Sequence, residues 1–67
     1  MNAKEWEQTV QSIVDDSNLQ TKEAGKHRVL TEWRTRLERE PMLLSPHKID
    51  EIVREVRRRL ETSNHSR

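Results

Sequence analysis

Arginine is concentrated in the last third of the chain, where Arg54, Arg57, Arg58 and Arg59 lie within a few residues of one another. The guanidinium group is always charged and donates paired hydrogen bonds to phosphate and carboxylate oxygens. A row of such residues is the chemistry that contacts a nucleic-acid backbone. The candidate nucleic-acid contacts are basic residues of the two later helical segments, namely Lys26, Arg28, Arg34, Arg54, Arg57 and Arg58.

The charge balance weakens this interpretation. Asp50 lies four residues before Arg54, and Glu55 lies four residues before Arg59, so that on a helix each acid faces an arginine. The net charge is only +1 and the pI is about 8.2, whereas nucleic-acid-binding domains often exceed a pI of about 9. The arginines also spread around a helical wheel instead of forming one stripe. We therefore expect nucleic-acid binding to be the alternative function.

A third interpretation assigns the arginines to helix pairing. Arg57 and Arg59 flank the apolar seam of their segment, where charged residues pair with those of a neighbouring helix. Residues 1–25 hold two basic and five acidic residues, a net charge of −3. We expect acids of this first segment to pair with the flanking arginines, in the same chain or in a second copy. The candidate acids are Glu5, Glu7, Asp15 and Asp16.

Catalytic and metal-binding patterns are missing from the sequence. His27, His47 and His65 are far apart and there is no cysteine, so we expect no metal site. We find no nucleophile motif, no glycine-rich phosphate loop and no paired carboxylates on an apolar face. A chain of 67 residues is also expected to lack a substrate pocket, which typically encloses about 300–1,000 Å³. We therefore expect a protein that is not an enzyme and uses no cofactor.

The spacing of apolar residues predicts an all-α fold of three helices. The first helix is predicted over residues 3–15, and Asn2 with Glu5 matches a capping box at its start. The apolar face of this helix consists of Trp6, Val10, Ile13 and Val14. The polar stretch DDSNLQT then predicts a break, because acids are unfavourable at a helix C-terminus. One continuous helix over residues 3–40 is the alternative.

The second helix is predicted over residues 22–40, with Thr21 as its candidate N-cap. Pro41 ends it, because proline disfavours the α conformation in the residue before it. Gly25 weakens its first turn by about 1 kcal/mol relative to alanine. The apolar stripe of this helix is Val29, Leu30, Trp33 and Leu37.

The third helix is predicted over residues 46–62 and forms a helical hairpin with the second. Ser45 is a strong N-cap, and Leu44 and Ile49 occupy the two positions of a hydrophobic staple. Pro46 suits the first helical position. The apolar face of this helix is narrow and consists of Ile49, Ile52, Val53, Val56 and Leu60.

Apolar residues are scarce for a domain of this size, at 30% of the chain against 37% charged. Small domains with lean cores usually need a disulfide, a metal or a partner. We therefore expect a single helical domain, residues 1–62, to be completed by dimerisation or by another protein, with residues 63–67 as a disordered tail. The candidate partner interface is Trp6, Val10, Ile13, Trp33, Leu37, Met42, Leu43, Ile49, Ile52, Val53, Val56 and Leu60.

These observations together predict a binding protein. No apolar run reaches the roughly 18 residues of a membrane span, and the start MNAKEWEQ lacks the apolar core of a signal peptide. We therefore expect a cytoplasmic protein without membrane contact. By elimination, its function is to bind another protein or itself, as a homodimer, regulator, inhibitor or assembly factor. Compact, charge-rich helical proteins of this size are common among phage and mobile-element products, and this favours such an origin.

Overall fold

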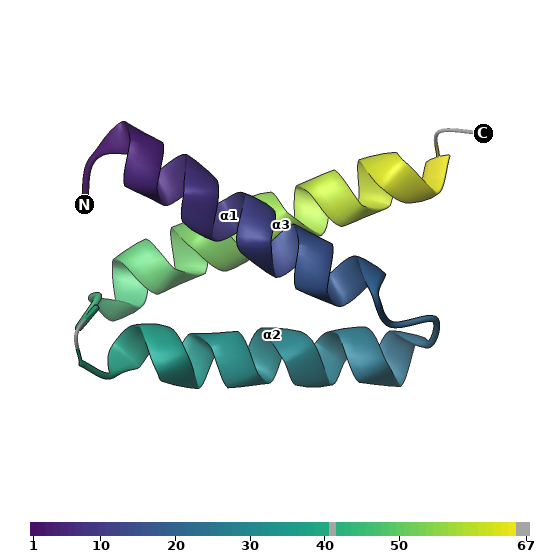
Figure 1. Ribbon diagram of the computed structural model, residues 1–67, viewed down its shortest axis with the longest axis horizontal. Coiled ribbons are helices and arrows are strands. Elements are labelled where there is room, and N and C mark those ends of the chain that lie inside the picture. Colours follow the sequence, from purple (N-terminus) through teal and green to yellow (C-terminus); the bar gives the residue numbers. More distant parts are fainter. Residues whose placement is uncertain (41, 66–67) are drawn as a thin grey trace.

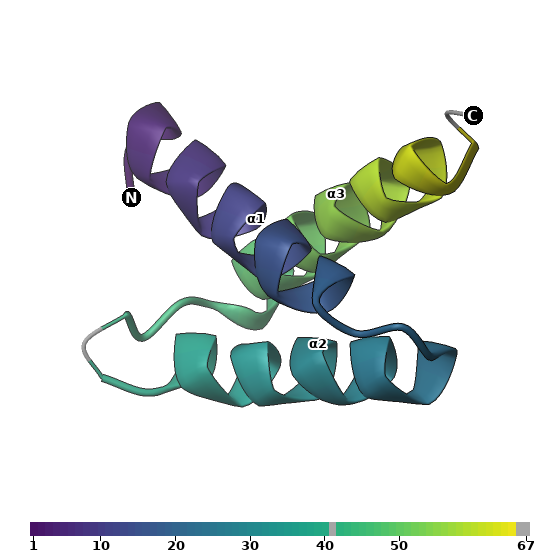
Figure 2. The same cartoon turned by 45° about the vertical axis from the view of Figure 1, so that its right-hand side comes forward.

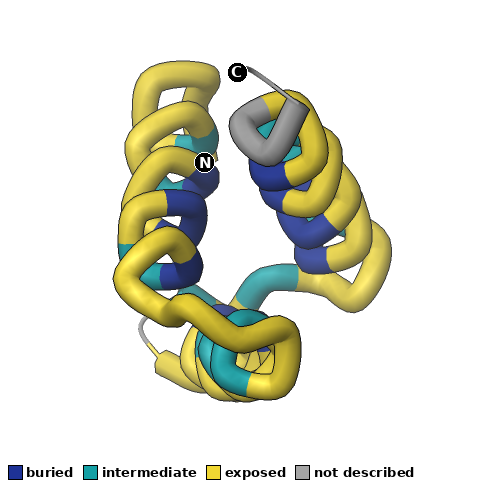
Figure 3. Tube along the Cα trace, turned by 90° about the vertical axis from the view of Figure 1, so that its right-hand side faces the viewer, coloured by how far each residue is buried: buried dark blue, intermediate teal, exposed yellow. Residues whose placement is uncertain are grey.

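The protein is an all-α three-helix structure, as the apolar spacing predicted. A computed structural model describes residues 1–40 and 42–65, with side chains described through residue 62. The elements are α1 (Ala3–Asn18), α2 (Glu23–Glu38) and α3 (Pro46–His65). α1 crosses α3, and α2 contacts both while running antiparallel to α3 (Figures 1 and 2). Seen end-on, the buried positions of the helices face a common centre (Figure 3).

Two of the predicted N-caps are confirmed. The Asn2 side chain accepts a hydrogen bond from the Glu5 backbone N–H at 2.8 Å, and the Glu5 carboxylate accepts one from the Asn2 N–H at 3.2 Å. This is the predicted capping box, which satisfies two otherwise unpaired donors at the start of α1. The Ser45 hydroxyl accepts from the Lys48 N–H at 3.2 Å. Both helix starts are therefore fixed by local sequence.

α1 runs beyond its predicted end at residue 15, as far as Asn18. The acids near its C-terminus do not end it, because Asp16 accepts a hydrogen bond from the indole Nε1–H of Trp33 on α2, at 2.9 Å. A tertiary contact thus offsets the unfavourable interaction with the helix dipole. The break between α1 and α2 overturns the alternative of one helix over residues 3–40.

α2 lies inside its predicted range of 22–40. The predicted N-cap was wrong: Lys22, not Thr21, holds that position, and no side chain caps the helix there. α2 ends at Glu38, so its last turn is shorter than predicted. The predicted stop at Pro41 lies outside the described residues. α2 is thus the helix whose start the sequence specifies least well.

α3 continues beyond its predicted end at residue 62, as far as His65. The tail was predicted over residues 63–67, and α3 includes its first three residues, 63–65. Residues 66–67 lie outside the described residues. None of the helices in the described part of the chain combines the length and apolarity that crossing a membrane requires.

The core consists of aliphatic side chains from all three helices. They are Val10, Ile13, Val14, Leu30, Leu37, Ile49, Ile52, Val53, Val56 and Leu60. α3 supplies half of them, whereas α2 supplies only Leu30 and Leu37. Trp6, Trp33, Met42 and Leu44 pack against this core and stay partly exposed. One chain buries these ten residues by itself. A partner could therefore cover only the partly exposed side chains at the edge of the core, and the predicted binding of such a partner stays a prediction.

Arg59 joins α3 to α1. Its Nη1 and Nη2 groups donate to the two carboxylate oxygens of Glu7, both at 2.8 Å, and its Nε donates to Glu55 at 2.8 Å. The expected pairing of a flanking arginine with an acid of the first segment is therefore confirmed, within one chain. Hydrogen bonds from Arg58 and Arg59 lower the pKa of Glu55 to about 2. The pKa of Glu7 is lowered by its hydrogen bond to Arg59.

Because these pKa values are lowered in the folded chain, its stability should decrease as the pH falls into the acidic range. The pKa of Glu55 is about 2 in the folded chain against an ordinary 4.5, so its stabilisation is complete above the ordinary pKa and is lost as the pH falls through the folded value. Arg59→Gln should lower the melting temperature at neutral pH and flatten its fall between about pH 5 and pH 2. Circular dichroism melts measure both effects, with Lys4→Gln as the control. An Arg59→Gln profile parallel to that of the unsubstituted chain would contradict this interpretation.

Ser17 is the polar side chain that lies in the core. It is 0% exposed, and its hydroxyl has no hydrogen-bond partner among the described residues. A buried hydroxyl without a partner costs roughly 1–3 kcal/mol of desolvation free energy. The site is therefore one where a smaller apolar side chain fits better than the native residue.

Ser17→Ala should raise the free energy of unfolding by about 1.5–3.5 kcal/mol, because it removes the unpaired hydroxyl and adds helix propensity. Ser12→Ala makes the same change at an exposed position of α1 and should yield only the propensity gain of about 0.5 kcal/mol. Urea unfolding of both variants measures the difference. Equal gains at the two positions would show that burial of the hydroxyl has no cost.

Candidate functional site

Two open grooves flank α2, one against α1 with a volume of about 620 Å³ and one against α3 with about 420 Å³. Both grooves are open to solvent, so the expectation that the chain lacks an enclosed substrate pocket stays a prediction. α1 and α3 diverge away from the point where they cross (Figure 2). Within the described residues, no cluster of three or more His, Asp or Glu side chains is placed to hold a metal ion.

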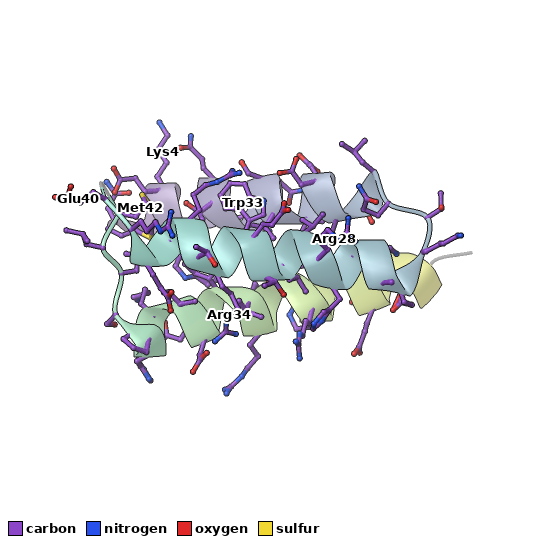
Figure 4. All side chains as sticks on the ribbon, turned by 90° about the horizontal axis from the view of Figure 1, so that it is seen from below. Lys4, Arg28, Trp33, Arg34, Glu40 and Met42 are labelled. Carbon is purple, nitrogen blue, oxygen red and sulfur yellow. The ribbon has the colours of Figure 1, made fainter. Side chains whose placement is uncertain are left out.

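The α1–α2 groove has an apolar floor and a polar rim. Its apolar lining is Met1, Trp33, Leu37, Met42 and Leu44. Its polar lining is Glu5, Gln8, Thr9, Ser12, Arg36 and Glu40. Figure 4 shows Trp33 and Met42 on the flank of α2 that faces α1, with Glu40 at the same end as Met42. The groove thus collects most of the partly buried apolar side chains at the edge of the core.

Trp33 is held in one orientation at this groove. Its indole Nε1–H donates to Asp16 at 2.9 Å, and the guanidinium of Arg36 lies 4.5 Å from the ring centroid. A cation over an indole face is attractive, by about 0.5–1 kcal/mol at exposed sites. A fixed aromatic side chain loses little conformational freedom when it is covered, which favours binding. The spacing of Trp33 and Arg36 is a helical i, i+3 pair and could have predicted this contact.

Leu43 projects from the loop between two groove residues, Met42 and Leu44. It is 62% exposed and has a φ of 49°, in the left-handed region. Backbone hydrogen bonds of 3.0 Å hold it there, from the Leu43 N–H to the Arg39 carbonyl and from the Leu44 N–H to the Leu37 carbonyl. This conformation costs a residue with a Cβ roughly 1–2 kcal/mol. The loop thus exposes a large apolar side chain in a conformation that glycine or asparagine would adopt more readily.

The α2–α3 groove has the opposite chemistry. It is lined by Arg34, Asp50, Val53, Arg54, Arg57, Arg58 and Glu61. Four of the six predicted nucleic-acid contacts therefore lie together, although they did not form one stripe on a helical wheel. The expected pairing of Asp50 with Arg54 was wrong, because Asp50 accepts from Arg34 of α2 instead, at 3.2 Å. Figure 4 shows Arg34 on the flank of α2 that faces α3.

The other two predicted nucleic-acid contacts lie apart from this groove. Lys26 is partly buried and shares a smaller cavity of about 280 Å³ with Arg57. Arg28 is exposed on α2 and is not among the residues that line the grooves. Lys26 therefore lies next to the α2–α3 groove, in a cavity that Glu23 and Glu61 also line, whereas Arg28 lies apart from it.

Eight of the twelve predicted interface residues are buried in the core of one chain. They are Val10, Ile13, Leu37, Ile49, Ile52, Val53, Val56 and Leu60. Of the remaining four, Trp33 and Met42 line the α1–α2 groove, and Trp6 packs at the core edge. Leu43 is exposed in the loop next to Met42 and is not one of the residues that line the groove. The apolar surface available to a partner therefore centres on the α1–α2 groove.

Comparison with protein-family models, curated proteins and solved structures finds no match to this chain. Its class is therefore defined by the fold and the two grooves: a small three-helix protein with one apolar and one basic flank of α2.

Leu43→Asn should leave the free energy of unfolding unchanged or raise it by up to about 1 kcal/mol, because asparagine tolerates the left-handed conformation. Leu44→Asn, the same change at the next residue, removes a side chain that packs on the core and should cost about 1–3 kcal/mol. Urea unfolding compares the two variants. A loss of stability at Leu43 as large as that at Leu44 would contradict the assignment of Leu43 to the surface.

Proposed function

We propose that this protein binds an amphipathic α-helix of another protein in its α1–α2 groove, and so acts as a regulator, inhibitor or assembly factor. The observation that carries the proposal is the exposed Leu43 in a left-handed conformation beside a groove lined by Trp33 and Met42. Steric strain at a surface residue is often tolerated where it serves a function. A side chain that contributes to binding gives a reason for leucine at this position.

The composition of the groove supports a protein ligand. Tryptophan is enriched among the residues that dominate binding energy at protein interfaces. Methionine side chains, supplied by Met1 and Met42, are flexible and polarisable and adapt to varied apolar surfaces. A ligand helix would place apolar residues at i, i+3, i+4 and i+7 against this floor.

The charge of the rim favours a basic partner. Glu5 and Glu40 outnumber Arg36 among the charged residues that line the groove. A partner helix with lysine or arginine beside its apolar stripe would complement this excess of negative charge. A second copy docked through the same groove would instead bring two negative rims together. The proposal therefore favours a different protein over a homodimer.

The test is selection of helical peptides from a displayed library on the chain, followed by binding measurements. In a Trp6→Phe background, Trp33 is the only tryptophan, and its emission should shift to shorter wavelength when a peptide covers the groove. Leu43→Asn should weaken binding by about tenfold, which corresponds to roughly 1.4 kcal/mol. Leu19→Asn, the same change at a leucine that is 78% exposed in the α1–α2 connection, is the matched control.

The outcomes separate the candidate partners. Enriched peptides with an apolar stripe and basic flanks, weakened by Leu43→Asn but not by Leu19→Asn, would support the proposal. Equal weakening by both variants would contradict it. Concentration-dependent self-association that shifts the Trp33 emission, abolished by Leu43→Asn, would replace the helix of another protein with a second copy.

A further inference from the structure

We infer that the α2–α3 groove is a second binding site, which takes the phosphate backbone of a nucleic acid. The groove brings four arginines from two helices to one surface, against two acids, Asp50 and Glu61. The site lies on the flank of α2 opposite the α1–α2 groove, and its ligand chemistry is independent of the function proposed above.

Two of the arginines are available to bind a ligand. Arg34 donates to Asp50, and Arg58 donates to Glu55. Among the described residues, no hydrogen bond or ion pair is found for the side chains of Arg54 and Arg57, and both are exposed. An incoming phosphate would therefore meet guanidinium groups that have no internal carboxylate to displace.

The basic surface is elongated, which suits a polymer better than a single phosphate. Arg57 also lines the adjoining cavity with Lys26, so cations extend from Lys26 through Arg57 to Arg34, with Glu23 and Glu61 beside them in that cavity. Lys26 and Arg34 are eight residues apart, or about 12 Å at the rise of an α-helix. One strand of duplex DNA carries a charge roughly every 3.4 Å along the axis, so this length covers about three or four phosphates.

The N-terminal part of the chain is negatively charged and the remainder is positively charged. Residues 1–25 have a net charge of −3, whereas residues 26–67 hold eleven basic and seven acidic residues, a net charge of +4. Counted by helix, α1 has a net charge of −3, whereas α2 and α3 have a net charge of +1 each. Such a field orients a polyanion towards the α2–α3 groove as it approaches.

The lining distinguishes nucleic acid from an acidic protein. Val53 is the apolar residue of this groove, and it is 5% exposed. Protein interfaces gain most of their affinity from large side chains in desolvated pockets, and this groove offers none. Binding here would depend on charge, as it does for contacts to a nucleic-acid backbone.

The test is fluorescence anisotropy of labelled single-stranded DNA, duplex DNA and RNA over a range of salt concentrations, with the full chain. Arg54→Gln/Arg57→Gln should weaken binding at low salt by about tenfold or more. It should also make the slope of log affinity against log salt concentration less steep by about 1.4–1.8, because each lost phosphate contact reduces that slope by roughly 0.7–0.9. Lys4→Gln/Arg39→Gln removes the same charge at exposed positions away from the groove and should change affinity less than about twofold. Circular dichroism melts confirm that both variants fold.

Salt-sensitive binding that is lost only in the groove variant would support the inference. No anisotropy change at low salt would overturn it, as would equal losses in both double variants, which would indicate attraction by net charge alone. Displacement of the nucleic acid by polyglutamate at matched charge concentration would also overturn it, in favour of an acidic protein ligand. Leu43→Asn, which targets the other groove, should leave nucleic-acid affinity unchanged, so failure of one proposal is distinguishable from failure of the other.

Discussion

The structure depends on the burial of a small set of aliphatic side chains where α1 crosses α3. Val10, Ile13 and Ile52 are fully buried there, and α3 supplies half of the core. Arg59 fixes the same pair of helices from outside, through its contacts to Glu7 and Glu55. Because branched aliphatic residues fill the centre, the indole rings and methionine side chains are left at its edge, where they are partly exposed.

α2 has a different role from the other two helices. It contributes only Leu30 and Leu37 to the core, so much of its surface lies beside the neighbouring helices without being buried by them. On the flank towards α1 this surface is apolar and contains Trp33, whereas on the flank towards α3 it contains Arg34. A protein that binds both a helix and a nucleic acid would use α2 as the element shared by its two sites.

Local patterns predicted much of the fold, because caps and apolar periodicity act within a few residues. The capping box at Asn2, the cap at Ser45 and the apolar face of α3 were all predictable, and so was the pairing of Arg59 with an acid of α1. The α1–α2 and α2–α3 grooves were not, since they depend on how the helices cross.

Periodicity identifies which side chains are buried, but it does not say whether the same chain or a partner covers them. That is why eight core residues were predicted as interface. Likewise, no local pattern pairs Asp16 with Trp33 or places Leu43 in a left-handed conformation.

The most direct test of this structure is whether one chain closes its core alone. Sedimentation equilibrium gives the mass of the folded protein, and thermal melts over a wide range of protein concentration show whether folding needs a second molecule. We expect the mass of one chain, 8.1 kDa, and a cooperative helical melt whose midpoint does not change with concentration. A midpoint that rises with concentration, together with a dimer mass, would contradict a core completed within a single chain.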